Sequence, residues 1–211
     1  MVPPASPNAP WTEGILYDPL ISGSWTPYCG VAVAIGGVLY GTAYGDAGGL
    51  FALAPPATSG RPWVETVIDA ISSMTSVVIG RGPVLYGATD STVYSLTPPP
   101  SPSVAWTLTV LLNIPYEEGH GGPNPGPLTL GENNTLYGTT GQGGPSKSGT
   151  AYVLKPPTTS GGAWTEILLH TFTGSDGANP TGLEIGSGGV LYGTTELGGA
   201  YGSGTVFALT E

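Results

Sequence analysis

The tripeptide Leu-Tyr-Gly occurs four times, as Leu39-Tyr40-Gly41, Leu85-Tyr86-Gly87, Leu136-Tyr137-Gly138 and Leu191-Tyr192-Gly193. Successive copies begin 46, 51 and 55 residues apart. A period of this length indicates one copied supersecondary unit that buries its apolar face only against its neighbours. We therefore expect residues 1–211 to form a single repeat domain.

Each unit contains four expected β-strands, bounded by glycine and proline. Strand a is the apolar run before Leu-Tyr-Gly, and strand b begins with that motif. Strand c has the form Thr205-Val206-Phe207-Ala208-Leu209, and strand d opens with tryptophan, as in Trp164-Thr165-Glu166-Ile167-Leu168. Strands a and b are apolar, whereas strand d alternates and carries acidic residues, so it is expected on the outside of the sheet.

The chain starts out of phase with this order. Residues 11–17, Trp11-Thr12-Glu13-Gly14-Ile15-Leu16-Tyr17, have the pattern of a strand d, and the last strand is the strand c at 205–209. Four complete units arise only if residues 11–17 complete the last one. This predicts an all-β, four-bladed β-propeller with four antiparallel strands per blade, closed by its N-terminal strand. An open stack is the alternative, and it would leave that first strand unpaired.

The expected blades follow from these strands. They span about 30–69, about 74–112, about 126–170, and about 181–211 together with 11–17.

The last two units carry further shared motifs. The last has Gly174-Ser175-Asp176-Gly177-Ala178-Asn179-Pro180 before strand a, and the third keeps Asn124-Pro125, while the second lacks the Asp-Gly-x-x-Pro segment. With Leu-Tyr-Gly-Thr-Thr, these units resemble the GloVer tandem repeat of large, often surface-anchored bacterial proteins. The resemblance implies a β-propeller-like fold and an extracellular or cell-surface setting. It brings no established catalytic residues.

Composition excludes several kinds of partner. The net charge is −10, with 14 acidic residues against four basic ones. Four scattered cations build no basic patch, so neither a nucleic acid nor an anionic membrane surface is an expected partner. No apolar run approaches the roughly 18 residues of a membrane-spanning helix, and the N-terminus lacks the apolar core of a signal peptide. The single cysteine, Cys29, excludes an internal disulfide and a cysteine-rich zinc site.

The loops between strands d and a, and between b and c, emerge on one face of such blades. From the leucine of Leu-Tyr-Gly to strand c, the third and fourth units each take 14 residues, while the second takes 7. This unevenness predicts a cleft beside blades three and four. Our leading hypothesis is a non-catalytic binding or interaction propeller for a carbohydrate, polymer or small-molecule ligand. Aromatic rings stack on sugar faces, and the expected ligand-binding residues are Trp25, Tyr28, Tyr44, Tyr116, Glu118, His120 and Tyr201.

Two alternatives stay open. One is a hydrolase or lyase acting on a saccharide or small ester, with His120 as base and Glu118 or Asp176 as acid or orienting group. The chain has no Gly-x-Ser-x-Gly, phosphate-loop or His-Glu-x-x-His motif, and His170 in a strand d is expected to be structural. The other alternative is a purely structural repeat module.

Glu184 breaks the repeat on an innermost strand, where its counterparts are Ala34, Val78 and Thr129. A carboxylate buried there must be paired, protonated or bound to a cation. It predicts an ion such as calcium in the central channel, with a glutamate facing water as the alternative. Ser175-Asp176-Gly177 could hold a loop cation only with backbone help. No other cofactor is expected.

Overall fold

The computed structural model describes residues 14–17, 25–27, 30–45, 49–58, 60–69, 75–101, 104–115, 124–159 and 161–210. Regular structure in these residues is β-sheet apart from two 3-10 turns, η2 (Glu132–Asn134) and η3 (Ser187–Gly189). None of the described segments is a helix long and apolar enough to cross a membrane.

Sixteen strands of the described residues form four antiparallel sheets, one for each Leu-Tyr-Gly motif. Blade one contains β1 (Trp25–Pro27), β2 (Ala32–Val33), β3 (Leu39–Gly45), β4 (Gly49–Ala54) and β5 (Val64–Asp69). Blade two contains β6 (Ser76–Ile79), β7 (Leu85–Ala88), β8 (Thr92–Thr97) and β9 (Thr107–Asn113). Blade three contains β10 (Thr129–Leu130), β11 (Leu136–Thr140), β12 (Thr150–Lys155) and β13 (Thr165–Thr171). Blade four contains β14 (Ala178–Ile185), β15 (Leu191–Leu197) and β16 (Thr205–Leu209).

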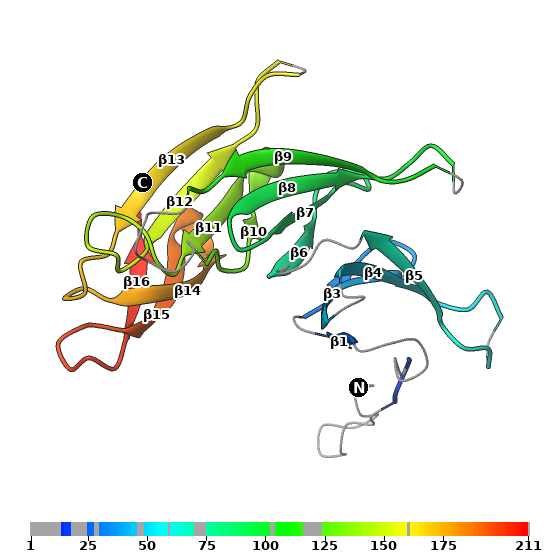
Figure 1. The fold of residues 1–211 in the computed structure, drawn as a ribbon, viewed down its shortest axis with the longest axis horizontal. Helices are drawn as coiled ribbons and strands as arrows, with labels where there is room; N and C mark the ends of the chain where they lie inside the picture. The colour runs from blue at the N-terminus through cyan, green and yellow to red at the C-terminus, as the bar shows by residue number, and fades with distance from the viewer. Residues whose placement is uncertain are drawn as a thin grey trace.

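The sheets follow one another around an arc in chain order, with blade one at one end and blade four at the other (Figure 1). This arrangement is a four-bladed β-propeller, as the repeat predicted. Blade one differs from the expectation because β1 and β2 both pair with β3, each along a different part of that strand. Trp25, expected in a loop, therefore lies in a strand.

The glycine of Leu-Tyr-Gly is needed because an aromatic ring of the next strand covers it. Each glycine pairs directly with an aromatic residue: Gly41 with Phe51, Gly87 with Tyr94, Gly138 with Tyr152 and Gly193 with Phe207. A Cβ atom on Gly41 or Gly138 would lie 2.5 Å from the opposing ring. Packed carbon atoms do not approach so closely, so each blade needs glycine at this point.

Neighbouring blades meet through a tryptophan and a tyrosine. Trp106 of blade two packs edge-on against Tyr40 of blade one, with ring centroids 6.2 Å apart. Trp164 of blade three packs in the same way against Tyr86 of blade two, at 5.7 Å. The tyrosine of the repeat motif and the tryptophan of strand d thus belong to one contact between blades.

In blades two and three the core lies in the middle strands, whereas β15 and β16 of blade four are only partly buried. Strands β7 and β8 and strands β11 and β12 are largely buried, whereas most residues of β9 and β13 are exposed. The outer strand is exposed as expected, but strand a is less buried than strands b and c, with Val33 67% and Ile185 39% exposed. Each a–b connection is a tight turn closed by one 2.8 Å backbone hydrogen bond, as from Gly131 to Thr135.

The predicted closure by the N-terminal strand is not confirmed. Residues 14–17 form no strand, and the sheet of blade four contains three strands among the described residues. The hydroxyl of Tyr17 instead donates a hydrogen bond to the carboxylate of Glu65 in blade one.

Candidate functional site

Three long loops meet on one face of blades three and four. They are the β11–β12 loop (141–149), the β13–β14 loop (172–177) and the β15–β16 loop (198–204), and we call their surface the loop face. The backbone amide of Phe172 donates to Gly149, at 3.0 Å, and that of Gly199 donates to Gly174, at 2.9 Å. These bonds tie each loop to the next, so the glycine-rich loops form one supported surface.

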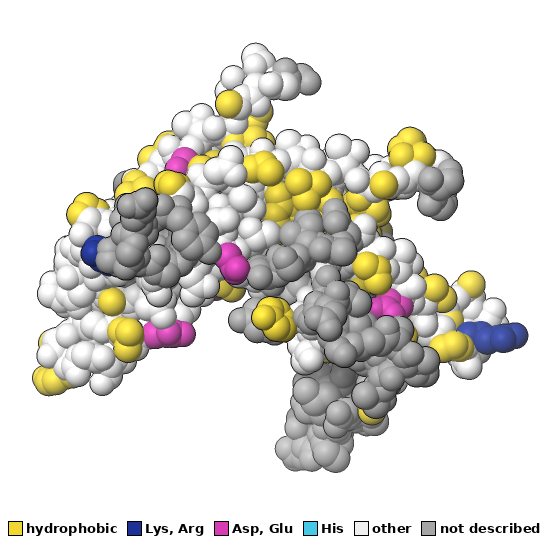
Figure 2. Space-filling model, viewed as in Figure 1, with side chains coloured by type: hydrophobic (Ala, Val, Ile, Leu, Met, Phe, Trp, Pro, Cys, Tyr) yellow, Lys and Arg dark blue, Asp and Glu magenta, His cyan; other side chains and the backbone are white. Residues whose placement is uncertain are grey.

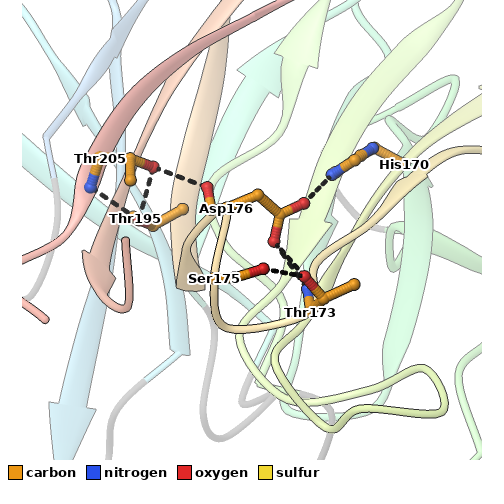
Figure 3. Close-up of polar contacts among 6 residues, drawn as sticks. All are labelled: His170, Thr173, Ser175, Asp176, Thr195 and Thr205. Atoms are coloured by element: carbon orange, nitrogen blue, oxygen red, sulfur yellow. Dashed lines mark hydrogen bonds and ion pairs between the residues drawn. The ribbon is translucent and has the colours of Figure 1, made fainter. Parts of the chain in front are cut away.

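Asp176 organises the β13–β14 loop (Figure 3). One carboxylate oxygen accepts hydrogen bonds from the backbone amide and the hydroxyl of Thr173, each at 2.8 Å. The other lies 2.8 Å from Nε2 of His170. These contacts, above all the Thr173 amide, lower the pKa of Asp176 to about 2. The aspartate of the Asp-Gly-x-x-Pro motif therefore stabilises the β13–β14 turn in which it lies, through hydrogen bonds to its carboxylate.

His170 is part of this cluster, although no motif in the sequence joins it to Asp176. It lies in β13, its ring packs edge-on against Phe172 at 4.7 Å, and its side chain is 36% exposed. The prediction that His170 is structural agrees with these contacts. No signal in the sequence could have found the pair, because the contact depends on the turn at Thr173 that Asp176 itself holds.

A pair of threonine hydroxyls fixes the base of the β15–β16 loop. Oγ1 of Thr195 and Oγ1 of Thr205 lie 2.9 Å apart, and the Thr205 hydroxyl donates to the carbonyl of Asp176 at 3.1 Å (Figure 3). Thr140 and Thr150 form the same pair in blade three, at 2.8 Å. The loops of the two blades are thus built alike and anchored to the sheets.

Two of the predicted ligand-binding residues have described side chains, and both are exposed. Tyr201 in the β15–β16 loop is 96% exposed, and Tyr44 at the end of β3 is 65% exposed. Glu196, near Tyr201 in sequence, is also exposed, and it accepts a hydrogen bond from Nδ2 of Asn179. Tyr201 therefore lies on the loop face together with acidic side chains.

The remaining predicted site residues lie outside the described part of the chain. These are Tyr28, Tyr116, Glu118, His120 and the side chain of Trp25. The acid–base arrangement of His120 with Glu118 or Asp176 thus stays a prediction. The polar partners that the structure assigns to the Asp176 side chain are His170 and Thr173.

Glu184 is exposed and pairs with Tyr192 across the β14–β15 ladder. It lines an open hollow of ≈ 400 Å³ with Thr181, Thr194 and Val206 among its walls. In the described residues no three His, Cys, Asp or Glu side chains lie close enough together to hold a metal ion. The channel cation at Glu184 and the loop cation at Asp176 stay predictions.

Fold and loops together define a repeat module of the β-propeller class. The chain belongs to the Gloeobacter/Verrucomicrobia repeat family, whose model matches residues 84–211. The match covers blades three and four and the part of blade two that follows β6, and it confirms the GloVer-type resemblance that the motifs indicated. A comparison with curated proteins finds no match for this chain.

Proposed function

We propose that this chain is a binding module that recognises a carbohydrate or a related neutral polymer through the loop face. Membership of a propeller repeat family supports a repeat module in general. The ligand class rests on the chemistry of the loops. The single observation that carries it is the almost fully exposed ring of Tyr201 on a hydrogen-bonded loop.

Rigidity of the loops supports recognition. The backbone amide of Gly204 donates to Gly198 at 3.0 Å and closes the β15–β16 loop on itself. The bond from Gly199 to Gly174 joins this loop to the neighbouring one. A loop that is already ordered loses little conformational entropy when it binds, so its contacts translate more fully into affinity.

The residue types suit a sugar. An exposed tyrosine ring offers an apolar face for stacking on a pyranose and a hydroxyl for hydrogen bonding. Carboxylates such as Glu196 accept hydrogen bonds from sugar hydroxyls. Charged side chains are few and well separated on the face seen in Figure 2, and the net charge is −10. A neutral or cationic ligand fits this surface better than an anionic one.

Tyr44 supplies a second exposed aromatic group at the corresponding end of another blade. It lies near the b–c end of β3, as Tyr201 lies in the b–c connection of blade four. We propose an extracellular or cell-surface setting for this binding, in line with the family resemblance. Two exposed rings on different blades suit a long polymer better than a single small ring.

Binding to insoluble and soluble polysaccharides tests the proposal. The unmodified protein, Tyr201→Ala and Tyr201→Phe are compared by co-sedimentation and calorimetry with a panel of neutral glycans. Tyr201→Ala should lose at least tenfold in affinity, while Tyr201→Phe keeps most of it because the ring remains. Val104→Ala, at an exposed site on the opposite c–d connection, is the matched control and should bind normally. Failure of the unmodified protein to bind any glycan would overturn the proposal.

A further inference from the structure

Blade four has one sheet face that the described residues leave open. Glu184 pairs with Tyr192 and Thr194 pairs with Val206, so these four side chains project from the same face of the sheet. The face borders the open hollow of ≈ 400 Å³, whose wall residues 127–129 of blade three complete. We call this space the blade-four hollow.

The equivalent face of each other blade is covered by the blade that follows it. The counterparts of the Thr194–Val206 pair are Thr42–Leu50, Ala88–Val93 and Thr139–Ala151. All of them are at most 1% exposed, and their apolar members cluster with residues of the following blade. In blade four, by contrast, Val206 is 81% exposed and Tyr192 is 48% exposed. The face of the blade-four hollow is therefore open to a ligand.

This face also carries a charge that its counterparts lack. The residue paired with the tyrosine of Leu-Tyr-Gly is Ala32, Val78 or Thr129 in blades one to three, and Glu184 in blade four. The register corrects the blade-one counterpart, which alignment of the sequence placed at Ala34. Another sheet packed against this face would desolvate the carboxylate at a high cost. The face therefore suits an occupant that carries the opposite charge.

A β-bulge positions two hydroxyl groups in the hollow. In the β14–β15 ladder the register shifts between Pro180 and Leu183, so Thr181 and Gly182 together oppose Thr194. Oγ1 of Thr181 and Oγ1 of Thr194 lie 2.8 Å apart. Because a hydroxyl oxygen has two lone pairs, this pair can accept further hydrogen bonds. Bulges re-aim side chains in this way next to active sites.

Hydrogen bonds from blade three hold the wall of the hollow. The Thr129 hydroxyl donates to the carbonyl of Leu183. The Thr139 hydroxyl donates to the carbonyl of Pro180, at 3.3 Å. These two carbonyls lie on either side of the bulge in β14. The bulge is thus fixed before a ligand arrives, which lowers the entropy cost of binding.

The groups in the hollow suit an organic cation better than a metal ion. None of the described residues that line the hollow is a lysine, an arginine or a histidine, so the Glu184 carboxylate is the charge that a ligand meets there. The exposed ring of Tyr192 attracts a cation to its face. Calcium takes about six to eight oxygen ligands, whereas an ammonium group has only three hydrogens to donate. One carboxylate with a few hydroxyl acceptors therefore matches a protonated amine.

A sugar ring matches the remaining groups. A pyranose offers an apolar face to Tyr192 and hydroxyl groups to Thr181 and Thr194. The hollow of ≈ 400 Å³ lies within the range of about 300–1,000 Å³ that holds small ligands. We propose that the blade-four hollow binds a protonated amino sugar, with its ammonium group on Glu184 and its ring on Tyr192. The site shares no residue with the loop face, so it does not rest on the function proposed above.

NMR titration of the full chain with glucosamine, N-acetylglucosamine and glucose tests the proposal at about pH 6, where the amine of glucosamine is protonated. Glucosamine should shift the backbone amides of Gly193 and Val206, and it should bind at least tenfold more tightly than the two uncharged sugars. Absence of glucosamine binding, or equal binding of glucose, would overturn the proposal. So would shifts confined to residues 198–204, which would place the sugar on the loop face.

A charge-neutralising variant identifies the carboxylate. Glu184→Gln should lower the affinity for glucosamine at least tenfold without changing the urea midpoint, because the side chain is exposed. Asp90→Asn neutralises an exposed carboxylate in the b–c turn of blade two, so it is the matched control and should bind normally. Unchanged affinity in Glu184→Gln would contradict the proposal. Calcium binding that Glu184→Gln abolishes would assign the hollow to a metal ion and would overturn it as well.

Discussion

Gly138 lies directly opposite Tyr152 in the β11–β12 ladder, beneath a tyrosine ring that is fully buried. Burial also raises the pKa of the Tyr152 hydroxyl well above its usual range. The pair explains why the third residue of the repeated tripeptide is glycine. A methyl group at this position would displace the ring from the centre of the blade.

Gly138→Ala is therefore expected to destabilise the protein by about 2 kcal/mol, since overpacking forces side chains and backbone to shift. Urea denaturation followed by circular dichroism measures the effect. Gly30→Ala is the control, because a Cβ atom there meets nothing within 4 Å. Adding Tyr152→Leu to Gly138→Ala should make the double variant more stable than the sum of the two single losses predicts, because the smaller side chain leaves room for the added methyl group. A double variant whose loss of stability equals that sum would contradict this steric cause.

The Tyr40–Trp106 contact couples blades one and two, and a double-mutant cycle measures it. Tyr40→Leu and Trp106→Leu should each destabilise the protein, and the pair should show a coupling of about 1 kcal/mol, typical of an edge-on aromatic contact. Tyr44→Leu combined with Trp106→Leu serves as the uncoupled reference, since Tyr44 is exposed. Strict additivity of Tyr40→Leu and Trp106→Leu would mean that the two rings do not stabilise each other.

Most of the fold was predictable because the repeated motif occupies equivalent packing positions from blade to blade. Leu-Tyr-Gly combines a buried leucine, a tyrosine for the blade junction and a glycine beneath an aromatic ring, so its copies mark equivalent strands. The strand β1 was not predicted, although Pro27 pairs with Ala43 in the same register as Pro125 with Thr140 and Pro180 with Thr195.

The long loops of blades three and four were predictable from the sequence, but the contacts among their side chains were not. Uneven loop lengths identified the face of blades three and four, and Tyr201 is exposed there. The His170–Asp176 pair was missed because one member was assigned to a strand and the other to a loop. Their contact depends on how sharply the chain turns at Thr173, and that turn is itself built by hydrogen bonds to Asp176. The pattern of residue types along the sequence does not show how sharply this turn bends.

Asp176 predicts a specific acid sensitivity. Its pKa is about 2 in the folded protein, against about 3.9 for an unfolded aspartate. A lowered folded pKa means that the carboxylate stabilises the fold fully above the unfolded pKa, and that this contribution is lost as the pH falls from about 4 to 2. Asp176→Asn should therefore cost roughly 1 kcal/mol at neutral pH, a modest value because the side chain is partly exposed and screened.

The measurement is urea unfolding of both proteins between pH 2 and 7. The difference in free energy of unfolding should be constant above about pH 5 and should shrink as the pH approaches 2. Thr173→Val removes the hydroxyl that donates to the Asp176 carboxylate and should raise the pKa of Asp176, which NMR titration of the carboxyl carbon can follow. A difference that stays constant down to pH 2 would exclude the assigned role of the carboxylate.

The asparagine of the Asn-Pro motif has a backbone role that can be separated from its side-chain role. Asn124 and Asn179 both adopt left-handed backbone conformations, with φ of 46° and 55°. Most side chains disfavour this region by roughly 1–2 kcal/mol, whereas asparagine and glycine accept it. Asn179→Ala should therefore destabilise the protein by about 1 kcal/mol in urea unfolding, through the backbone and through loss of the hydrogen bond to Glu196.

Asn179→Gly and Glu196→Gln separate the two contributions. Asn179→Gly keeps the left-handed backbone but removes the amide, and Glu196→Gln keeps the backbone but weakens the hydrogen bond. If backbone conformation is the main reason for asparagine, Asn179→Gly is more stable than Asn179→Ala, and Glu196→Gln is close to the unmodified protein. Equal losses in Asn179→Gly and Asn179→Ala would instead assign the stabilisation to the side chain, and the positive φ would then carry no measurable cost at this position.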